Sequence, residues 1–192
     1  MKKILKDDIA PQPVQIMVVL DESGSMLSVR EATIKAVNAF IEAQSQLPGQ
    51  AQVSLIKFSD VASLQYARVD LAKAPELRYI PNGMTALNDA IVLAHTQLVS
   101  WNPARAIVCI VTDGEENNSR ASNELARQCV SAMRERGWEV VFLAANIDVE
   151  RATKNYGFTR GVQFDASAKG LASMSVSMNA MATSYRTSPE PD

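Results

Sequence analysis

The sequence predicts an α/β fold: a doubly wound, mostly parallel central sheet of about six strands, with one antiparallel edge strand and helices on both faces. Three observations predict it. Apolar runs rich in β-branched residues recur along the chain, segments with helical spacing separate most of them, and the runs themselves are continuously apolar. Continuously apolar strands are typical of parallel sheets that are covered on both faces, because neither face of such a strand meets solvent.

Six segments predict the strands in order. The four strongest are residues 14–20, 53–58, 106–112 and 140–145, which are rich in Val, Ile and other large apolar side chains. A weaker segment at 62–69 follows so soon after the second strand that we expect the two to pair as a hairpin, which gives the antiparallel edge strand. A short strand is expected at 162–164.

Apolar side chains three and four residues apart predict helices between these strands. The side chains that mark the first three helices are Ala36, Val37, Phe40 and Ile41; Leu87, Ile91, Ala94 and Leu98; and Leu125, Cys129, Ala132 and Met133. Turn-forming residues end them: "LPGQ" after the first, Asn102-Pro103 after the second and Gly137 after the third. A short helix is expected near 148–156 and a longer one over 168–186.

The last helix has an unusual composition. Its apolar stripe consists of Leu171, Met174, Met178, Met181 and Tyr185. Core packing with methionine as a gap-filling residue explains this stripe. No charged residue occurs between Lys169 and Arg186, so the outward face is also small and neutral. A second hypothesis is therefore that this face contacts another copy of the chain.

Composition and charge exclude several classes of protein. The 192 residues are 47% hydrophobic and 21% charged, which is typical of one domain with one core. The net charge is −2 and no Lys/Arg cluster with interleaved aromatics occurs, so nucleic acid is not an expected partner. No segment approaches the roughly 18 uncharged apolar residues of a membrane span.

We expect residues 1–13 to be an N-terminal extension, residues 14–186 to form a single domain, and residues 187–192 ("TSPEPD") to be a loose C-terminal tail. The start of the chain, "MKKILKDDIAPQP", lacks the apolar stretch of a signal peptide. Cys109 lies in an apolar run and Cys129 in a predicted helix, so a disulfide is not expected. The expected location is the cytoplasm.

Oxygen-bearing side chains follow two of the predicted strands. In "VVLDESGSM", Asp21, Ser23 and Ser25 alternate after the first strand, and in "IVTDGEENNS", Asp113 follows residue 112 directly. Thr85 lies in the turn of "YIPNGMTALNDAI" that opens the second helix. In parallel sheets, ligands bind beyond the carboxyl ends of the strands, where the strand order reverses. If the two strands are neighbours there, all five side chains converge.

The convergence of these five residues predicts a metal site. All five are oxygen donors, and oxygen ligands favour a hard cation, Mg²⁺ before Mn²⁺, with Ca²⁺ the least favoured of the three. Taken singly, each motif has a plainer explanation. The serines would act as helix caps and "TDG" as a strand-ending turn. Asp89 suits a helix dipole and His95, the single histidine, is expected to pack along its helix.

Together, "DESGS", the Thr85 loop and "TDG" resemble the metal-ion-dependent adhesion site (MIDAS) of von Willebrand factor type A (VWA) domains. The resemblance runs from about Val14 to the final helix, and "YIPNGMTALNDAI", "TDGEENNSR" and "WEVVFLAANID" are similar to short, stand-alone bacterial and phage members. It implies that Ser23, Ser25 and Thr85 contact the metal, with Asp21 and Asp113 acting through water or alternating with it. Two positions depart from the family pattern: Met84 replaces a frequent second glycine, and Glu22 fills a slot that is usually small or neutral.

The resemblance implies a divalent-cation-dependent protein-binding domain in which the metal captures an acidic side chain of a partner. A metal held mainly by neutral hydroxyls stays short of anionic ligands, so an open position would attract a carboxylate. Nearby Glu22, Glu115 and Glu116 would attract the cation and repel an acidic partner while no metal is bound. Cytoplasmic relatives often work beside AAA+ ATPases, so an ATPase or assembly factor is an expected partner.

Two alternatives remain open at this stage. One is a Mg²⁺-dependent hydrolase or phosphatase, and the other is a metal-stabilised structural domain that self-associates through residues 168–186. We do not expect the protein to be an enzyme and assign no catalytic residue, because the sequence lacks the G-x-S-x-G and P-loop motifs. An aspartyl-phosphate phosphatase would also normally have a second Asp where Ser23 stands, and a Lys in the site.

Overall fold

The computed structural model describes residues 12–188, which form one six-stranded sheet covered by helices on both faces. The strand order is β3-β2-β1-β4-β5-β6. The strands are β1 (Val14–Asp21), β2 (Ala51–Phe58), β3 (Ala62–Asp70), β4 (Ala106–Thr112), β5 (Glu139–Ala144) and β6 (Arg160–Gln163). Only the β2–β3 pair is antiparallel, so the expected fold class is confirmed. The expected extension and tail lie largely outside the described residues.

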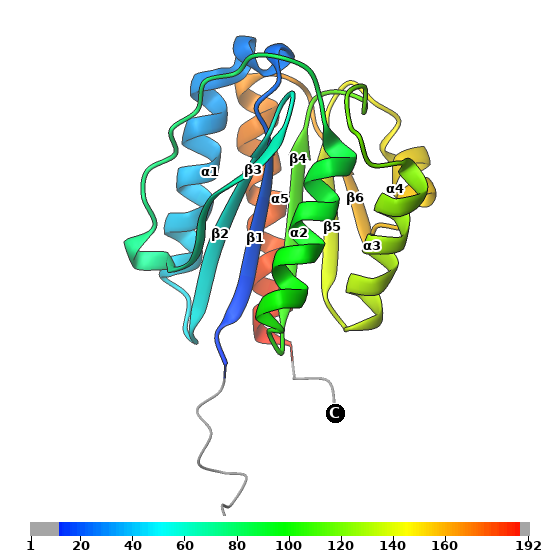
Figure 1. The fold of residues 1–192 in the computed structure, drawn as a ribbon. Coiled ribbons are helices and arrows are strands. Elements are labelled where there is room, and N and C mark those ends of the chain that lie inside the picture. The colour runs from blue at the N-terminus through cyan, green and yellow to red at the C-terminus, as the bar shows by residue number, and fades with distance from the viewer. Residues whose placement is uncertain (1–11, 189–192) are drawn as a thin grey trace, which may run out of the picture.

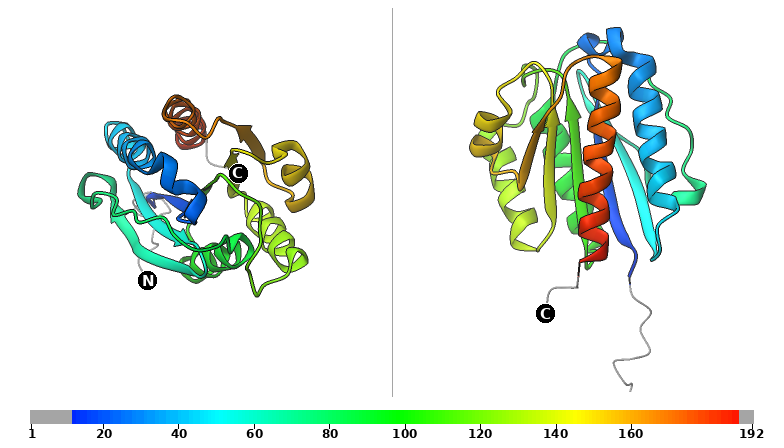
Figure 2. Two further views of the ribbon diagram at one scale, coloured as in Figure 1. Left: turned by 90° about the horizontal axis from the view of Figure 1, so that it is seen from above. Right: turned by 180° about the vertical axis from the view of Figure 1, so that it is seen from behind.

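The helices form two layers, one on each face of the sheet (Figures 1 and 2). They are α1 (Arg30–Ser45), α2 (Leu87–Trp101), α3 (Asn123–Glu135), α4 (Val149–Tyr156) and α5 (Ala168–Thr187), with short 3-10 helices η2 (Gly24–Val29) and η3 (Leu71–Lys73). Helices α1 and α5 pack on one face, and α2 and α3 cover the other. None of the helices in residues 12–188 has the length and hydropathy to cross a bilayer.

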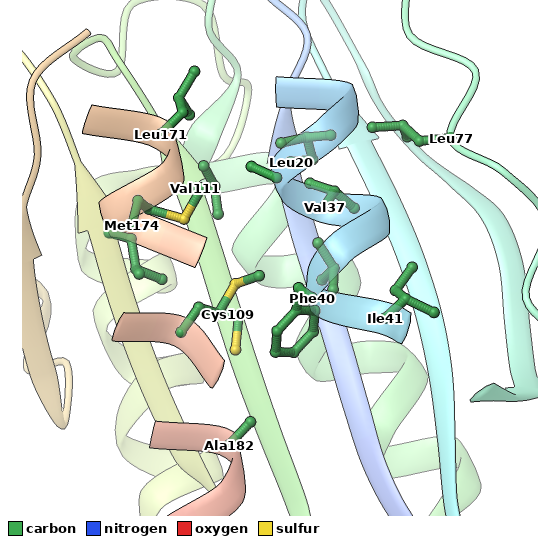
Figure 3. Packing of buried hydrophobic residues seen from close by; sticks show 14 of the residues in the cluster. Leu20, Val37, Phe40, Ile41, Leu77, Cys109, Val111, Leu171, Met174 and Ala182 are labelled. Carbon is green, nitrogen blue, oxygen red and sulfur yellow. The ribbon is translucent and has the colours of Figure 1, made fainter. Parts of the chain in front are cut away.

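The two central strands are buried along their whole length, which explains their continuous apolar composition. Along β1, Ile16, Val18 and Leu20 point into the α1–α5 layer, while Met17 and Val19 point into the α2–α3 layer. Figure 3 shows the first layer, where Phe40 of α1 and Met174 of α5 lie over Cys109 of β4. This alternation places one apolar cluster on each face of the sheet.

The structure differs from the sequence expectation at several helices and at one strand. Ser25 lies in the short 3-10 helix η2, and α1 starts only at Arg30. Leu125 was expected on the buried side of the third helix, but it is 43% exposed. The buried side consists of Ala126, Cys129, Val130 and Met133. The last strand spans Arg160–Gln163 and starts two residues earlier than expected. The methionine stripe of α5 is buried, as core packing predicts.

An extended strap, residues 74–86, links the two ends of the sheet. It has no regular secondary structure and runs from η3 to the start of α2 along the outside of α1 (Figure 1). Two of its own side chains, Leu77 and Tyr79, are buried. The Leu77 N–H donates to Asn38 Oδ1 at 3.1 Å, and Arg30 Nε donates to the Tyr79 carbonyl at 2.8 Å. These contacts fix the strap against α1 before it reaches the loops beyond β1.

Strand β1 lies between β2 and β4, so the strand order reverses at the β1–β4 pair. The chain leaves β1 toward β2 through α1, which lies on one face. It enters β4 through α2, which lies on the other face. The carboxyl ends of β1 and β4 therefore open into a crevice between two helical connections, which is where open α/β sheets bind their ligands.

Candidate metal centre

The turn after β1 gathers three oxygen-bearing side chains. Asp21 ends the strand and is fully buried. Its Oδ1 accepts a hydrogen bond from the Ser23 backbone N–H at 2.7 Å, which tightens the turn. The hydroxyl oxygens of Ser23 and Ser25 lie 3.1 Å apart. The alternating spacing therefore places both hydroxyls on the same side of the turn.

Asp113, the first residue after β4, joins this turn from the neighbouring strand. Its side chain is 5% exposed, and its Oδ1 accepts a hydrogen bond from Ser25 Oγ at 2.6 Å. The parallel register of β1 and β4, with Leu20 opposite Val111, brings the two loops to the same level. The structure thus links Ser23, Ser25 and Asp113 in one continuous chain of side-chain contacts.

Thr85 reaches the cluster from the end of the strap. It is 4% exposed, its N–H donates to Asn117 Oδ1 at 2.9 Å, and its carbonyl accepts from the Asn117 N–H at 3.1 Å. A Cβ atom at Gly114 would lie 3.7 Å from Thr85 Oγ1 and 4.0 Å from Ser25 Oγ. Both hydroxyls therefore border Gly114, and all five residues singled out in the sequence lie around one point.

The two carboxylates of the cluster receive hydrogen bonds from neutral donors. Burial raises the pKa of Asp21, the hydrogen bonds from Thr112 and Ser23 partly oppose this, and the Asp113 charge adds to it. Within residues 12–188, neither carboxylate forms an ion pair with Lys, Arg or His. Two buried like charges without a cationic neighbour are unfavourable, so the cluster favours a cation from solvent.

The donor set fits a hard divalent cation. It comprises two carboxylates and three hydroxyls, all oxygen, and a hard ion such as Mg²⁺ prefers oxygen ligands. Across residues 12–188, no three His, Cys, Asp or Glu side chains gather as a metal cluster. Neutral hydroxyls would therefore have to complete the ligand set, and this would leave a bound ion with much of its positive charge.

Thr112 and Tyr79, for which the sequence predicted no role, form hydrogen bonds to Asp21. Thr112 Oγ1 donates to Asp21 Oδ2 at 2.5 Å and accepts from the Gly114 N–H at 3.2 Å, so it fixes both loops. The Tyr79 hydroxyl donates to the Asp21 carbonyl. Burial, and then the charges of Asp21, Asp113 and Glu22, raise the pKa of Tyr79, so it remains a donor at neutral pH. The only sequence signal was a hydroxyl directly before "DG".

Glu116 and Asp89 fix the loop after β4 onto α2. Glu116 Oε1 accepts from the backbone N–H groups of Asn118 and Ser119, and its Oε2 accepts from the Asn88 N–H at 2.8 Å. Asp89 accepts from the backbone N–H of Ala121 at 2.8 Å. Asp89 therefore anchors a loop, a role beyond the helix-dipole contribution expected from its position.

The acidic residues expected to repel a partner are mostly engaged within the chain. Glu22 forms a 2.8 Å ion pair with Lys57 and accepts from the Ile80 N–H at 2.7 Å. Glu115 forms an exposed pair with Arg151. The unusual Glu22 thus fastens the strap to the metal loop, and the uncompensated negative charge belongs chiefly to Asp21 and Asp113.

Gly83 explains why the turn before Thr85 does not need a second glycine at position 84, where this chain has Met84. Gly83 has a φ of 75°, and a Cβ there would lie 2.7 Å from the Asp60 carboxylate. The same carboxylate accepts from the Met84 N–H at 2.9 Å. One glycine therefore meets the conformational demand of this turn, and the Met84 side chain is 47% exposed.

A comparison with protein families identifies the fold. Residues 16–116, which contain the five clustered side chains, match the family model of the von Willebrand factor type A domain. The match covers more than half of the chain. This chain belongs to the von Willebrand factor type A family. No curated protein sequence matches this chain.

Solved structures share the fold of this VWA domain at low sequence identity. The VWA protein of Catenulispora acidiphila is 19% identical, with a TM-score of 0.69 over 89% of this chain and 42% of its own. Proximal thread matrix protein 1 of the mussel byssus is 17% identical, with a TM-score of 0.68 over 90% of this chain and 46% of its own. The PilB minor pilin of Streptococcus sanguinis is 14% identical, with a TM-score of 0.70 over 94% and 64%. The chain thus spans less than half of the first two proteins.

One structure of the mussel protein has a zinc-occupied MIDAS motif. VWA domains are generally interaction modules, so the family and the fold together support a metal-dependent adhesion or interaction domain.

Proposed function

We propose that this VWA domain binds Mg²⁺ through Asp21, Ser23, Ser25, Thr85 and Asp113 and uses it to capture an acidic side chain of a partner protein. The observation that carries the proposal is the buried pair of carboxylates, Asp21 and Asp113, whose hydrogen bonds come only from neutral groups. Mn²⁺ is the closest substitute, and Ca²⁺ fits less well.

The family pattern implies which of the five residues would contact the ion directly and which would act through water. Ser23, Ser25 and Thr85 would contact the ion through their hydroxyls, and Asp21 and Asp113 would act through water or in alternation with it. When bound, the ion supplies a positive charge that a carboxylate from another molecule can complete. Thr112 holds the Asp21 carboxylate in a fixed orientation, because it donates to the Oδ2 atom at 2.5 Å.

The proposed partner is a protein that offers an exposed Asp or Glu. An AAA+ ATPase or an assembly factor is the family-level candidate. We place the domain in a reducing, cytoplasmic compartment, because Cys109 and Cys129 are both free and buried. The net charge of −2 argues against nucleic acid as a ligand.

The geometry gives less support to a hydrolase. A nucleophilic Asp21 would need an accessible carboxylate, but its side chain is fully buried and both oxygens accept hydrogen bonds. Lys57 is held by Glu22 and by the Arg78 carbonyl at 3.0 Å. We therefore propose no catalytic role. Hydrolysis of p-nitrophenyl phosphate that Asp21→Asn abolishes would reverse this assignment.

Calorimetry tests metal binding. We expect Mg²⁺ and Mn²⁺ to bind the wild-type domain, and Ser25→Ala and Thr85→Ala to weaken binding at least tenfold, because each removes a ligand oxygen. Ser173→Ala, at an exposed position on α5, is the matched control. Absence of metal-binding heat at millimolar Mg²⁺ and Mn²⁺ would contradict the proposal.

A short peptide tests carboxylate capture. The probe is acetyl-Gly-Ser-Glu-Ser-Gly-amide, and its control carries Gln in place of Glu. We expect the Glu peptide to shift amide resonances of the turn after β1 in Mg²⁺ but not in EDTA, and the Gln peptide to shift none. Equal shifts in Mg²⁺ and EDTA would show that binding does not involve the metal.

A further inference from the structure

Large apolar side chains are exposed around the metal centre. Within residues 12–188, six large hydrophobic residues are mostly or nearly half exposed, and four of them lie on η2, the β2–β3 turn and the strap, next to the proposed ligand residues. These four, which we term the collar, are Leu27 (62% exposed), Val61 (65%), Ile80 (69%) and Met84 (47%). The other two, Leu125 and Val176, lie on α3 and α5. Exposed apolar groups gathered in one region of a monomer commonly mark an interaction surface.

Hydrogen bonds connect the three segments that bear the collar. The Gly24 N–H, at the start of η2, donates to the Gly83 carbonyl at 3.0 Å, and the Asn82 N–H donates to the Glu22 carbonyl at 2.8 Å. The β2–β3 turn joins through Asp60, which accepts from the Met84 N–H at 2.9 Å. The collar is therefore held in place before a ligand arrives, which lowers the entropic cost of binding.

The opposite side of the metal centre has a different character. There a cavity of about 190 Å³ is lined by Glu115, Asp148 and Arg151, together with Phe142 and Tyr156. Glu115 and Arg151 pair at 3.2 Å, and both side chains are about two-thirds exposed. The site thus has one apolar wall and one charged, polar wall.

We propose that the metal centre selects an acidic residue whose neighbours in the partner are large apolar side chains, with those neighbours seated on the collar. This inference rests on the proposed function. The metal supplies the charge that an Asp or Glu complements, and Leu27, Ile80 and Met84 supply apolar area beside it. A carboxylate alone would leave the collar exposed to water, whereas an apolar neighbour removes that area from water.

A protein segment fits this surface better than an anionic membrane does. Membrane surfaces attract clusters of Lys and Arg. Here Lys57 is paired with Glu22, and Asp60 and Glu115 add negative charge at the rim. Two arginines near the collar form no ion pair within residues 12–188: Arg78, two residues before Ile80, and Arg120, two residues after the Asn118 side chain that donates to the Asp60 carbonyl at 3.1 Å. Two arginines on separate segments could pair with a further acidic residue of a peptide and do not form a basic patch.

Two peptides test the selectivity. The first is acetyl-Gly-Leu-Glu-Leu-Gly-amide, and the second is acetyl-Gly-Ser-Glu-Ser-Gly-amide, with titrations followed by amide resonances in excess Mg²⁺. We expect the Leu-flanked peptide to bind about tenfold more tightly, a difference of about 1.4 kcal/mol. Both should lose binding in EDTA.

Variants localise the effect. Ile80→Ser and Leu27→Ser should each reduce the advantage of the Leu-flanked peptide several-fold while Mg²⁺ affinity, measured by calorimetry, stays unchanged. Val176→Ser removes an equally exposed apolar side chain from α5 and should leave the advantage intact. Retention of the full advantage in both collar variants would overturn the assignment of the collar.

The outcomes separate this inference from the function on which it rests. Equal affinity of the two Glu peptides in Mg²⁺, with loss of both in EDTA, would overturn the collar and leave metal-dependent capture standing. Binding of either peptide in EDTA, or of neither in Mg²⁺, would overturn both. Mg²⁺-dependent binding to phosphatidylserine vesicles without peptide binding would overturn the choice of a protein segment.

Discussion

The two ends of the sheet both contain buried charged side chains, but they neutralise them differently. At the amino end, Arg105 is 9% exposed, donates to the Tyr185 carbonyl at the end of α5 and to Ser188 Oγ, and lies over the Tyr185 ring at 4.9 Å. Arg186 donates to the carbonyls of Gln44 at 2.6 Å and Gly49 at 3.0 Å. These carbonyl groups lie at helix ends and in turns, where they carry partial negative charge.

At the carboxyl end, no Lys, Arg or His within residues 12–188 pairs with Asp21 or Asp113, and their hydrogen bonds come from hydroxyl and N–H donors. The charges of Arg105 and Arg186 are therefore met by groups of the chain itself, whereas the charges of Asp21 and Asp113 are not balanced by a cation within residues 12–188. On our proposal, the amino end serves stability and the carboxyl end serves recognition. Substitutions at the carboxyl end should thus change how much metal stabilises the domain, whereas substitutions at the amino end should not.

The largest effect is expected at the amino end. Arg105→Met keeps much of the side-chain volume but leaves the α5 carbonyl groups without their donor, so we expect a loss of about 3 kcal/mol in the free energy of unfolding. Urea denaturation should give the same loss in Mg²⁺ and in EDTA. Arg127→Met, at an exposed position on α3, should leave the transition unchanged. A loss that depended on metal would break the distinction between the two ends.

Metal should stabilise the domain by a comparable amount through the carboxyl end alone. At about a hundredfold excess over its Kd, Mg²⁺ should add about 2.7 kcal/mol to the free energy of unfolding of the wild-type chain. Thermal denaturation should show the full increase in wild type and in Arg105→Met, and an increase of at most about 1.4 kcal/mol in Thr85→Ala, whose affinity is at least tenfold lower. If Thr85→Ala kept the whole increase, the site would lie elsewhere.

Asp113→Asn sharpens the comparison, because it should have opposite effects with and without metal. Asparagine Oδ1 can still accept from Ser25, while one of the two buried like charges is removed. We expect the variant in EDTA to be more stable than wild type by about 1 kcal/mol, and to gain nothing from Mg²⁺. Glu76→Gln, an exposed carboxylate in the strap, is the control. A less stable variant in EDTA would mean that the two carboxylates do not oppose each other.

The smallest effect is expected where the strap meets the site. Tyr79→Phe retains the buried ring and removes one hydrogen bond to the Asp21 carbonyl, which should lower the free energy of unfolding by about 1 kcal/mol. Tyr66→Phe is the matched control, since its hydroxyl bonds to no residue within 12–188. A loss of Mg²⁺ affinity beyond a few-fold would show that Tyr79 acts on the ligands as well as on the fold.

The sequence predicted the sheet well because its central strands are continuous apolar runs rich in β-branched residues, as strands covered on both faces should be. Residues 106–112 form β4 over the predicted bounds, and 14–20 and 53–58 differ from β1 and β2 by one or two residues. The antiparallel hairpin and the short last strand also exist. The expectation for Leu125 was wrong because the buried stripe of α3 begins one residue later, at Ala126, so Leu125 lies to one side of it and is 43% exposed.

The residues proposed as ligands were found because each follows a strand or opens a helix. The roles of Thr112, Tyr79 and Glu116 were not found, because each depends on a partner on a distant segment and such pairings leave no periodic pattern in the sequence. Thr112 donates to the Asp21 carboxylate, Tyr79 donates to the Asp21 carbonyl, and Glu116 accepts from the Asn88 N–H. Glu22 likewise was predicted to act through its charge at the metal. Its ion pair with Lys57 depends on the β1–β2 register, in which Leu20 lies opposite Lys57.

The metal loops lie far apart along the polypeptide: Asp21 accepts its hydrogen bond from Thr112, 91 residues further on. A growing chain on the ribosome could therefore hold no ion at this position until β4 had been synthesised and had paired with β1. Ion capture would be a late event in maturation, and it would report that the central strands are assembled in the correct order.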